Sequence, residues 1–384
     1  MADSSPDPVT PETVPGRWPV EQAKAWYAAQ PWLVGCIYIP ANAINQLEMW
    51  QAETFDPDTI RRELGWAQDL GFNSLRVYLH NLLWADDADG MYARMDTFLD
   101  LCRERSIRTF FVLFDDCHHD SPQPGPQPLP VPGYHNTGWL QSPGRKLGEA
   151  YARGTISEAH RARLEGFVKE TIRQFANDER VLAWDLYNEP GRGVMPGEIE
   201  PGQPVPHFGD GSSRLVLDSF RWAREVAPSQ PIFSTAEGSV GEVNIEIAKL
   251  NSDVYAFHSY DGPEGFEKTC RRYAEADRPA LCTEYMARTT GCTFEACLPI
   301  LKQYNIGAYN WGFVAGKTGC IWPWGSGIPG KNKHQARAEG IVESEVTRLP
   351  EPELWFHEVL RLDGTPYRQE EVDCIRRLTR EANG

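Results

Sequence analysis

The sequence Val181-Leu182-Ala183-Trp184-Asp185-Leu186-Tyr187-Asn188-Glu189-Pro190 contains the clearest strand in the chain. A short, mostly apolar run of this kind is typical of a strand that is buried on both faces, as in a parallel sheet. Because Pro190 has no N–H for a ladder hydrogen bond, we expect Glu189 at the carboxyl end of this strand. A second apolar run, Pro279-Ala280-Leu281-Cys282-Thr283-Glu284, also ends in a glutamate. The sequence therefore raises one question: does the fold bring Glu189 and Glu284 together?

Eight short apolar stretches of this type alternate with helical patterns along the chain. The predicted strands are residues 32–39, 73–80, 109–114, 181–190, 231–235, 254–260, 279–284 and 307–311. The predicted helices are residues 58–70, 91–105, 157–175, 213–226, 243–250, 266–276, 294–304 and 352–362. Such alternation indicates parallel strands joined by right-handed helical crossovers. Eight of them predict an α/β protein with an eight-stranded parallel β/α (TIM) barrel and long loops at the carboxyl-end face.

Length, charge and composition limit the classes of protein that fit. The chain of 384 residues accommodates one barrel of roughly 250 residues with insertions. It has no apolar run of about eighteen residues, so we expect no membrane span. The net charge of −16 argues against nucleic acid and favours an uncharged ligand over an anionic one.

The N-terminal segment and the cysteines concern domain limits and cellular location. Residues 1–19 are rich in Pro, Asp, Ser and Thr, which predicts a disordered lead, with residues 20–384 forming one domain. The lead lacks the basic start and apolar core of a signal peptide, so we expect a cytoplasmic protein. The nine cysteines are odd in number and contain no CxxC pair. We therefore expect free thiols and no zinc site.

The polar residues of the predicted strands lie in the later half of each strand or just beyond it. They are Arg76, the cluster Asp115 to His119, Asn188, Glu189, His258, Tyr260, Glu284 and Trp311. Any one of them alone has a structural explanation, such as an ion pair or a core aromatic. Because the carboxyl ends of barrel strands meet at one face, together they predict a single site.

Two carboxylates across one barrel mouth suit the cleavage of a glycosidic bond, in which one starts protonated and the other ionised. A separation of about 5 Å would let the second attack the sugar carbon and retain its configuration. Arg76 near Glu284 would keep that carboxylate ionised, and Tyr260 could donate a hydrogen bond to it. Asn188 suits a sugar hydroxyl, and Trp311 offers a flat apolar face to a pyranose ring.

This pattern resembles the clan A glycoside hydrolases, and most closely family 5, the cellulase-like enzymes. The matching residues are Arg76, Asn188-Glu189-Pro190, His258, Tyr260, Glu284 and Trp311, on strands two, four, six, seven and eight. The resemblance implies that Glu189 is the acid/base and Glu284 the nucleophile, with retention and no metal or organic cofactor. That family usually has a histidine two residues after an aspartate at the end of strand three. Here this spacing gives Cys117 from Asp115 or His118 from Asp116, and His118 is our predicted site residue.

The predicted function is a retaining glycoside hydrolase that acts on a short oligosaccharide or glycoside, exo-acting on a β-pyranoside. An α-L-arabinofuranosidase of the same clan is an alternative. A metal-dependent hydrolase is a second alternative, with ligands among Asp115, Asp116, His118, His119, Asp120 and His258. A non-catalytic sugar-binding barrel is a third. Glu237, after strand five, is expected to be a hydrogen-bonding residue. The identity of the sugar and the oligomeric state are not predicted.

Overall fold

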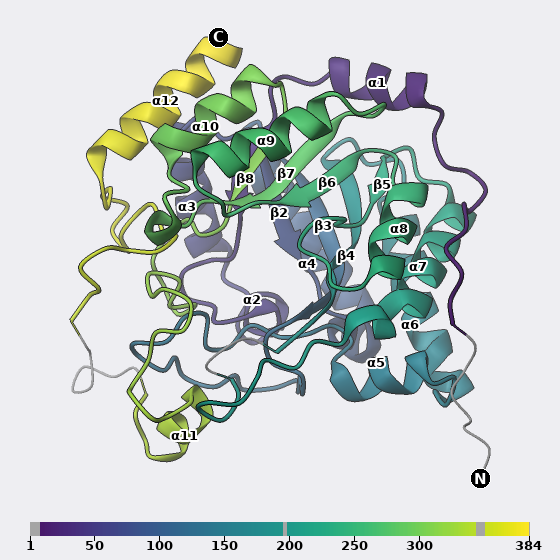
Figure 1. Ribbon diagram of the computed structural model, residues 1–384, viewed down its shortest axis with the longest axis horizontal. Coiled ribbons are helices and arrows are strands. Elements are labelled where there is room, and N and C mark those ends of the chain that lie inside the picture. The colour runs from purple at the N-terminus through teal and green to yellow at the C-terminus, as the bar shows by residue number, and fades with distance from the viewer. Residues whose placement is uncertain (1–7, 195–197, 343–349, 384) are drawn as a thin grey trace.

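The computed structural model describes residues 8–194, 198–342 and 350–383. Within these residues, eight parallel strands form the centre of a single α/β barrel (Figure 1). The strands are β1 Val34–Ile37, β2 Ser74–Tyr78, β3 Arg108–Cys117, β4 Val181–Gly193, β5 Ile232–Phe233, β6 Tyr255–His258, β7 Ala280–Tyr285 and β8 Gly307–Asn310. Each predicted strand overlaps one of these, so the predicted fold class is confirmed.

The strands pair in the order β5-β4-β3-β2-β1-β8-β7-β6, and every neighbouring pair is parallel. The two ends of this sheet, β5 and β6, meet through one parallel bridge between Thr235 and Ala256. Two backbone hydrogen bonds support this bridge, from Asp253 N to Ile232 O (2.9 Å) and from Ala236 N to Ala256 O (3.1 Å). The barrel is thus nearly closed, and β5–β6 is the seam with the fewest ladder bonds.

Helices surround the barrel on its outer face. They are α1 Val20–Ala28, α2 Gln46–Trp50, α3 Pro57–Asp69, α4 Asn81–Glu104, α5 Arg145–Ala152, α6 Glu158–Gln174, α7 Ser213–Val226, α8 Glu242–Asn251, α9 Pro263–Ala274, α10 Phe294–Gln303, α11 Lys333–Ala338 and α12 Gln369–Asn383. Two short 3-10 turns, η1 Gly209–Ser212 and η2 Arg288–Thr290, complete the elements. In Figure 1, α9, α10 and α12 cover the upper side, α6 to α8 cover the right side, and the long loops with α11 gather below.

Local sequence explains where several helices begin. The Asp56 side chain accepts hydrogen bonds from the backbone N–H of Asp58 and Thr59 and caps α3, which has Pro57 in its first turn. Ser157 caps α6 in the same way, by accepting from His160 N. The predicted helix 91–105 extends ten residues further back, because α4 continues through a non-helical kink at Asp87 to Asn81.

The prediction of a closing helix at residues 352–362 is wrong. This segment has no helix, because its backbone bonds to the loop after β8 instead of to its own preceding turn. Phe356 N donates to Ile321 O (2.8 Å), His357 N to Cys320 O (3.1 Å) and Val359 N to Phe313 O (3.0 Å). The closing helix is α12, which begins later, at Gln369. The apolar residues of 352–362 therefore form a loop against the barrel mouth.

Two irregularities in the sheet aim the two glutamates. On β7, Phe257 pairs with Cys282 and His258 with Glu284, so one extra residue, Thr283, lies on that strand. Such a bulge re-aims the next side chain, and it turns Glu284 toward the barrel mouth. On β4, Glu189 has φ +41°, and the strand continues irregularly to Gly193, which pairs with Cys117. Glu189 thus lies at a bend within β4 and not at its last residue.

Residues 8–19 have no helix or strand, yet they lie against the barrel, while residues 1–7 of the predicted lead lie outside the described residues. Val14 N donates to Asn251 Oδ1 (2.6 Å), and Trp18 N donates to Asp253 Oδ1 (2.8 Å). Both side chains are buried. All nine cysteines are free thiols and all are buried. In the described part of the chain, we find no helix with the length and apolarity that a bilayer crossing requires.

Candidate active site

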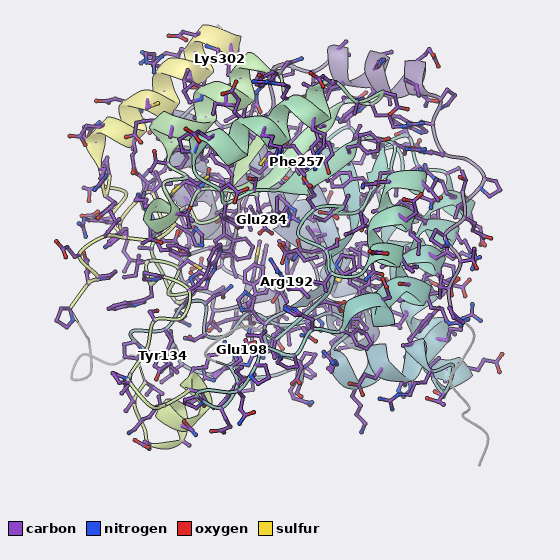
Figure 2. All side chains as sticks on the ribbon, viewed as in Figure 1. Tyr134, Arg192, Glu198, Phe257, Glu284 and Lys302 are labelled. Carbon is purple, nitrogen blue, oxygen red and sulfur yellow. The ribbon has the colours of Figure 1, made fainter. Side chains whose placement is uncertain are left out.

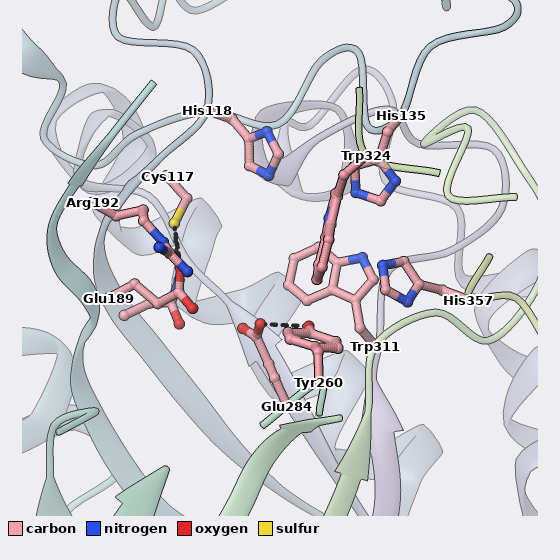
Figure 3. Close-up of a pocket in the computed structure, with 11 residues that line it drawn as sticks. Cys117, His118, His135, Glu189, Arg192, Tyr260, Glu284, Trp311, Trp324 and His357 are labelled. Atoms are coloured by element: carbon pink, nitrogen blue, oxygen red, sulfur yellow. Dashed lines mark hydrogen bonds and ion pairs between the residues drawn. The ribbon is translucent and has the colours of Figure 1, made fainter. Parts of the chain in front are cut away.

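The fold brings Glu189 and Glu284 together, although ninety-five positions separate them in the sequence. A carboxylate oxygen of each, together with a ring nitrogen of His258, lies within 4.8 Å of the others. Both glutamates line one small pocket at the mouth of the barrel (Figure 3). In Figure 2 Glu284 and Arg192 lie near the centre of the molecule, and Lys302 lies at its edge.

Glu284 accepts hydrogen bonds from three donors. Arg76 Nη1 donates to its Oε1 (2.8 Å), Tyr78 OH donates to the same oxygen (3.1 Å), and Tyr260 OH donates to Oε2 (2.8 Å). Burial, together with the charge of Glu284, raises the pKa of Tyr260, so the phenol keeps its proton and remains a donor. A fixed cation and two hydroxyl donors thus surround the Glu284 carboxyl group.

Arg76 is completely buried, and its guanidinium is held in place on the barrel axis. Its Nη2 donates to Asp185 Oδ2 (2.7 Å) and to Asn188 Oδ1 (2.7 Å), and its Nε also reaches Asp185 (3.1 Å). Arg76 and Asp185 both have side chains with no exposed surface. This network explains why an arginine is tolerated inside β2: each of its nitrogens has a partner. The sequence pointed to Glu284 as partner and missed Asp185.

Glu189 also accepts three hydrogen bonds, from different residues. Arg192 Nε and Cys117 Sγ donate to its Oε2 (3.1 and 3.0 Å), and His258 Nδ1 lies 2.7 Å from its Oε1. Burial alone would raise the pKa of Glu189, but Arg192 and His258 outweigh it and hold the pKa below its usual value. Burial and the neighbouring Glu189 raise the pKa of the Cys117 thiol, so Cys117 contacts Glu189 as a neutral donor. These contacts together favour an ionised Glu189.

Two glycines allow this arrangement around Glu189. Gly191 has φ +84°, and a Cβ there would lie 2.2 Å from Val240 O, so only glycine lets the chain turn back and place Arg192 beside Glu189. Gly238 has φ +97°, and a Cβ there would lie 2.8 Å from Glu189 Oε1 and 2.9 Å from His258 Nδ1. The backbone at Gly238 thus packs directly against the Glu189–His258 pair.

The predicted site residues divide into two groups. Those that line the pocket are His118, Asn188, Glu189, Tyr260, Glu284 and Trp311. Arg76 and His258 do not line it; they lie behind the carboxylates and contact them. Asn188 is oriented by Arg76 and by Asp115, to which its Nδ2 donates (2.9 Å). Glu237 lies apart, since it forms an ion pair with Arg272.

Five pocket residues were not predicted as site residues: Cys117, His135, Arg192, Trp324 and His357. Cys117 and His118 both line the pocket, which answers the question left open at the end of strand three. His135 and Trp324 come from loops that the sequence showed to be rich in proline and aromatic residues. His357 lies in the segment that was wrongly predicted as a helix, and no sequence signal placed it here.

The carboxylates of Asp115 and Asp116 are used by the scaffold. Asp115 accepts from Trp139 Nε1 (2.9 Å) and from Asn188, and Asp116 accepts from Tyr187 OH (2.8 Å), Gly191 N (2.6 Å) and Ser212. Among the described residues, the group with metal-ligand spacing is Glu189, His258 and Glu284. Arg76 and Arg192 already bind those two carboxylates and would repel a cation there. The donor set therefore fits a metal ion poorly.

The fold and the site define a class: a parallel β/α barrel with a pair of glutamates, from β4 and β7, facing one pocket. Solved structures share this fold. Exo-beta-1,4-mannosidase Op5Man5 from Opitutaceae bacterium strain TAV5 has a TM-score of 0.55 and 17% identity, covering 91% of this chain and 59% of that protein. The GH5_18 protein of Streptomyces cattleya, in complex with Manβ1-4GlcNAc, has a TM-score of 0.55 and 12% identity, covering 92% and 81%.

A third example is the β-mannanase of the blue mussel Mytilus edulis, with a TM-score of 0.51 and 16% identity, covering 73% of this chain and 86% of that one. The chain thus spans less than two thirds of the length of Op5Man5. No family model matches the sequence. No curated protein matches it either. The predicted resemblance to family 5 is confirmed at the level of the fold.

Proposed function

We propose that this protein is a retaining glycoside hydrolase, with Glu284 as nucleophile and Glu189 as acid/base. The observation that carries the proposal is the separation of the two carboxylates, which lie within 4.8 Å of each other across one pocket. Retaining enzymes have carboxyl groups about 5 Å apart, whereas inverting enzymes need about 6.5–9.5 Å to admit a water. The exposed face of the site is also the carboxyl end of the strands, where barrel enzymes carry their chemistry.

The reaction proceeds in two displacements. In the first, a Glu284 oxygen attacks the anomeric carbon, the glycosidic C–O bond breaks, and Glu189 gives its proton to the departing oxygen. The product is an alcohol and a glycosyl ester on Glu284. In the second, Glu189 takes a proton from water, the water oxygen attacks the anomeric carbon, and the ester C–O bond breaks. Two inversions leave the sugar with its original configuration.

The assignment of Glu284 as nucleophile follows from the permanence of its partners. Arg76 is wholly buried and lies 2.8 Å from Glu284, so a fixed positive charge faces this carboxylate before it attacks the sugar and again when the ester breaks. Arg192 has a side chain that is 36% exposed and touches Glu189 only through Nε, so it is free to move as substrate enters. His258 Nδ1 lies 2.7 Å from Glu189 Oε1. When Glu189 carries a proton it donates this hydrogen bond to His258 Nδ1, and in the acid step the same proton passes from Glu189 to the departing oxygen.

The small pocket supports exo action on a short substrate, because a groove for a polymer would be open at both ends. For an exo-acting enzyme, β-D-mannosides are the first substrates to test, since the barrels of similar fold include a named exo-β-1,4-mannosidase and a complex with Manβ1-4GlcNAc. A panel of nitrophenyl glycosides should also include β-glucosides, β-xylosides, β-galactosides and α-L-arabinofuranosides, the last because of the alternative raised by the sequence.

The test is a Glu284→Ala variant, with the anomer of the first product followed by NMR in the unmutated protein. We expect the variant to lose at least about a thousandfold in kcat and to regain part of it with azide, which replaces the missing nucleophile. Glu237→Ala is the matched control, since Glu237 is a third strand-end carboxylate that pairs with Arg272 outside the pocket. Near-normal turnover of Glu284→Ala, or an inverted first product, would overturn the proposal.

A further inference from the structure

One side of the pocket is formed by His135, Trp324 and His357, which we call the histidine wall. The three residues come from separate loops, after β3, after β8 and before α12. Ring contacts join them to each other and to Tyr260: Trp324 lies 4.9 Å from Tyr260, and His357 lies 5.2 Å from His135 (centroid distances). Figure 3 shows the wall beside Tyr260, Trp311 and Glu284, while Glu189, Cys117 and Arg192 lie across the pocket from it.

The hydrogen bonds of the two wall histidines fix their tautomers. His135 Nδ1 contacts Trp322 O (2.8 Å), and His357 Nδ1 contacts Met286 O. A carbonyl oxygen can only accept, so each Nδ1 carries the ring proton. Burial, followed by the neighbouring His118, lowers the pKa of His135 to about 3, and burial, followed by His135, lowers the pKa of His357 well below its usual value. Both rings are neutral at pH 7, so each Nε2 bears a lone pair.

Both Nε2 atoms are available to a ligand. Neither has a hydrogen-bond partner within the described residues, and neither is among the fully enclosed side-chain atoms that lack a partner, so both reach open space. A neutral imidazole nitrogen of this type accepts a hydrogen bond and cannot donate one. No wall residue carries a positive charge: Arg192, the one arginine among the described residues that line the pocket, lies on the side of Glu189. Arg288, whose charge contributes to the lowered pKa of His357, does not line the pocket and is bonded to Glu371. Lys333 is buried and bonded to Glu198 (2.7 Å), and it does not line the pocket.

The chemistry of the two glutamates decides which part of a substrate meets this wall. The acid must reach the departing oxygen, so the leaving group lies beside Glu189 and Arg192. The sugar ring then extends away from Glu189, over Trp311 and past Glu284, toward the histidine wall. The hydroxyl groups that reach the wall are those on the carbons of this sugar that lie farthest from its anomeric carbon.

We infer that His135 and His357 are specificity-determining residues, which accept hydrogen bonds through Nε2 from two hydroxyl groups of an uncharged terminal sugar. This inference rests on the proposed function for the orientation of the sugar. It identifies the glycone as a neutral hexose or pentose, because the carboxylate of a uronic acid would face two lone pairs with no cation to bind it. The wall and its loops also close that end of the pocket, which limits the enzyme to a terminal residue.

The test combines variants with altered substrates. His135→Asn and His357→Asn keep a side-chain N–H at the place of Nδ1, and therefore the bonds to Trp322 O and Met286 O, but remove Nε2. His160→Asn, on the exposed face of α6, is the control. The substrates are the 4-nitrophenyl β-glycoside that the panel identifies, its 3-, 4- and 6-deoxyfluoro analogues, which cannot donate at the changed position, and the corresponding uronide.

We expect each wall variant to lose about 10- to 100-fold in kcat/KM on the parent glycoside. For each wall histidine, one deoxyfluoro analogue should show a similar loss of kcat/KM with the unmutated protein. The same analogue should lose little more with the variant of that histidine, because the fluorine and the substitution remove the same hydrogen bond. The uronide should not be turned over. If the wall variants stay within threefold of the unmutated protein on the parent, or lose equally on every analogue, the inference is wrong. If a variant fails to fold, the analogues test the same contacts in the unmutated protein.

Binding separates this inference from the proposed function. Affinity for D-mannose, D-glucose, D-galactose and D-xylose is measured by ligand-detected NMR on the unmutated protein and the wall variants. A protein that binds one of these sugars through the wall but hydrolyses no glycoside would refute the hydrolase proposal and leave the wall supported. Turnover that is indifferent to the wall variants would refute the wall alone. No turnover and no binding would refute both.

Discussion

Arg192 provides the sharpest test of how the neighbours of Glu189 set its pKa. Arg192→Gln removes a positive charge whose Nε lies 3.1 Å from Glu189 Oε2. Two unit charges about 4 Å apart interact by ~4 kcal/mol near a protein surface and by ~1 kcal/mol in bulk water. Because the Arg192 side chain is 36% exposed, solvent screening reduces its contribution to about 1–2 kcal/mol. At about 1.4 kcal/mol per pKa unit, the pKa of Glu189 should rise by about one unit.

The assay is the pH dependence of kcat/KM on an alkyl glycoside, whose poor leaving group needs the acid. The acid must be protonated in the free enzyme, so activity falls as pH rises through the pKa of Glu189. Arg192→Gln should move this alkaline limb upward by about one pH unit, and Arg192→Lys should move it less.

Arg221→Gln is a matched control for this experiment. Arg221 also pairs with a carboxylate three residues away, Asp218, and its side chain is 44% exposed, but it lies on α7, outside the pocket. The pH dependence of kcat/KM for Arg221→Gln should match that of the unmutated protein. If the alkaline limb of Arg192→Gln moves upward by less than about 0.3 pH unit, or moves downward, the role assigned to Arg192 is refuted.

Three further predictions follow from the same structure. Glu189→Ala should reduce kcat/KM far more for alkyl glycosides than for nitrophenyl glycosides, and equal losses on both would count against its acid role. Arg76→Met should lower the free energy of unfolding in urea by about 3–5 kcal/mol, because Asp185 and Glu284 would be left as unpaired buried charges, whereas the exposed Arg61→Met should change it by less than about 0.5 kcal/mol. Burial raises the pKa of Glu63 to about 7 in the folded protein, from about 4.5 in the unfolded chain. Protonated Glu63 therefore contributes its full stabilisation below pH 4.5, and this stabilisation is lost as pH rises through 7. Relative to Glu63→Gln, the unmutated protein should therefore lose about 2–3 kcal/mol of unfolding free energy between pH 4.5 and pH 8, and a constant difference across that range would contradict the shift.

The strands were predictable because period and composition are local signals. Apolar runs such as 181–187 and 279–282 need no knowledge of the rest of the chain, and the alternation with helices then determines a parallel barrel. The convergence of Arg76, Asn188 and Glu284 on one face follows from that topology alone. For the same reason, the pairing of Glu189 with Glu284 was available from sequence before any distance was known.

His357 and the orienting groups were not predictable, because they depend on where loops lie. His357 belongs to a segment with helix-like apolar spacing, but its backbone hydrogen bonds go to the loop after β8, which no local signal indicates. The turn of Glu284 into the pocket depends on a bulge at Thr283, a feature of strand register. Arg192 reaches Glu189 only because Gly191 bends the chain through a conformation with φ +84°.

The sparse seam between β5 and β6 has a consequence for how the protein responds to heat. Glu189 is carried by β4 and His258 by β6, and the two-residue strand β5 lies between them. Because one bridge joins β5 to β6, local opening there costs less than opening elsewhere in the ring. Such opening stretches the hydrogen bond between Glu189 and His258 while the remaining seven interfaces stay intact. On warming, catalytic competence should accordingly disappear at a temperature below that of cooperative melting.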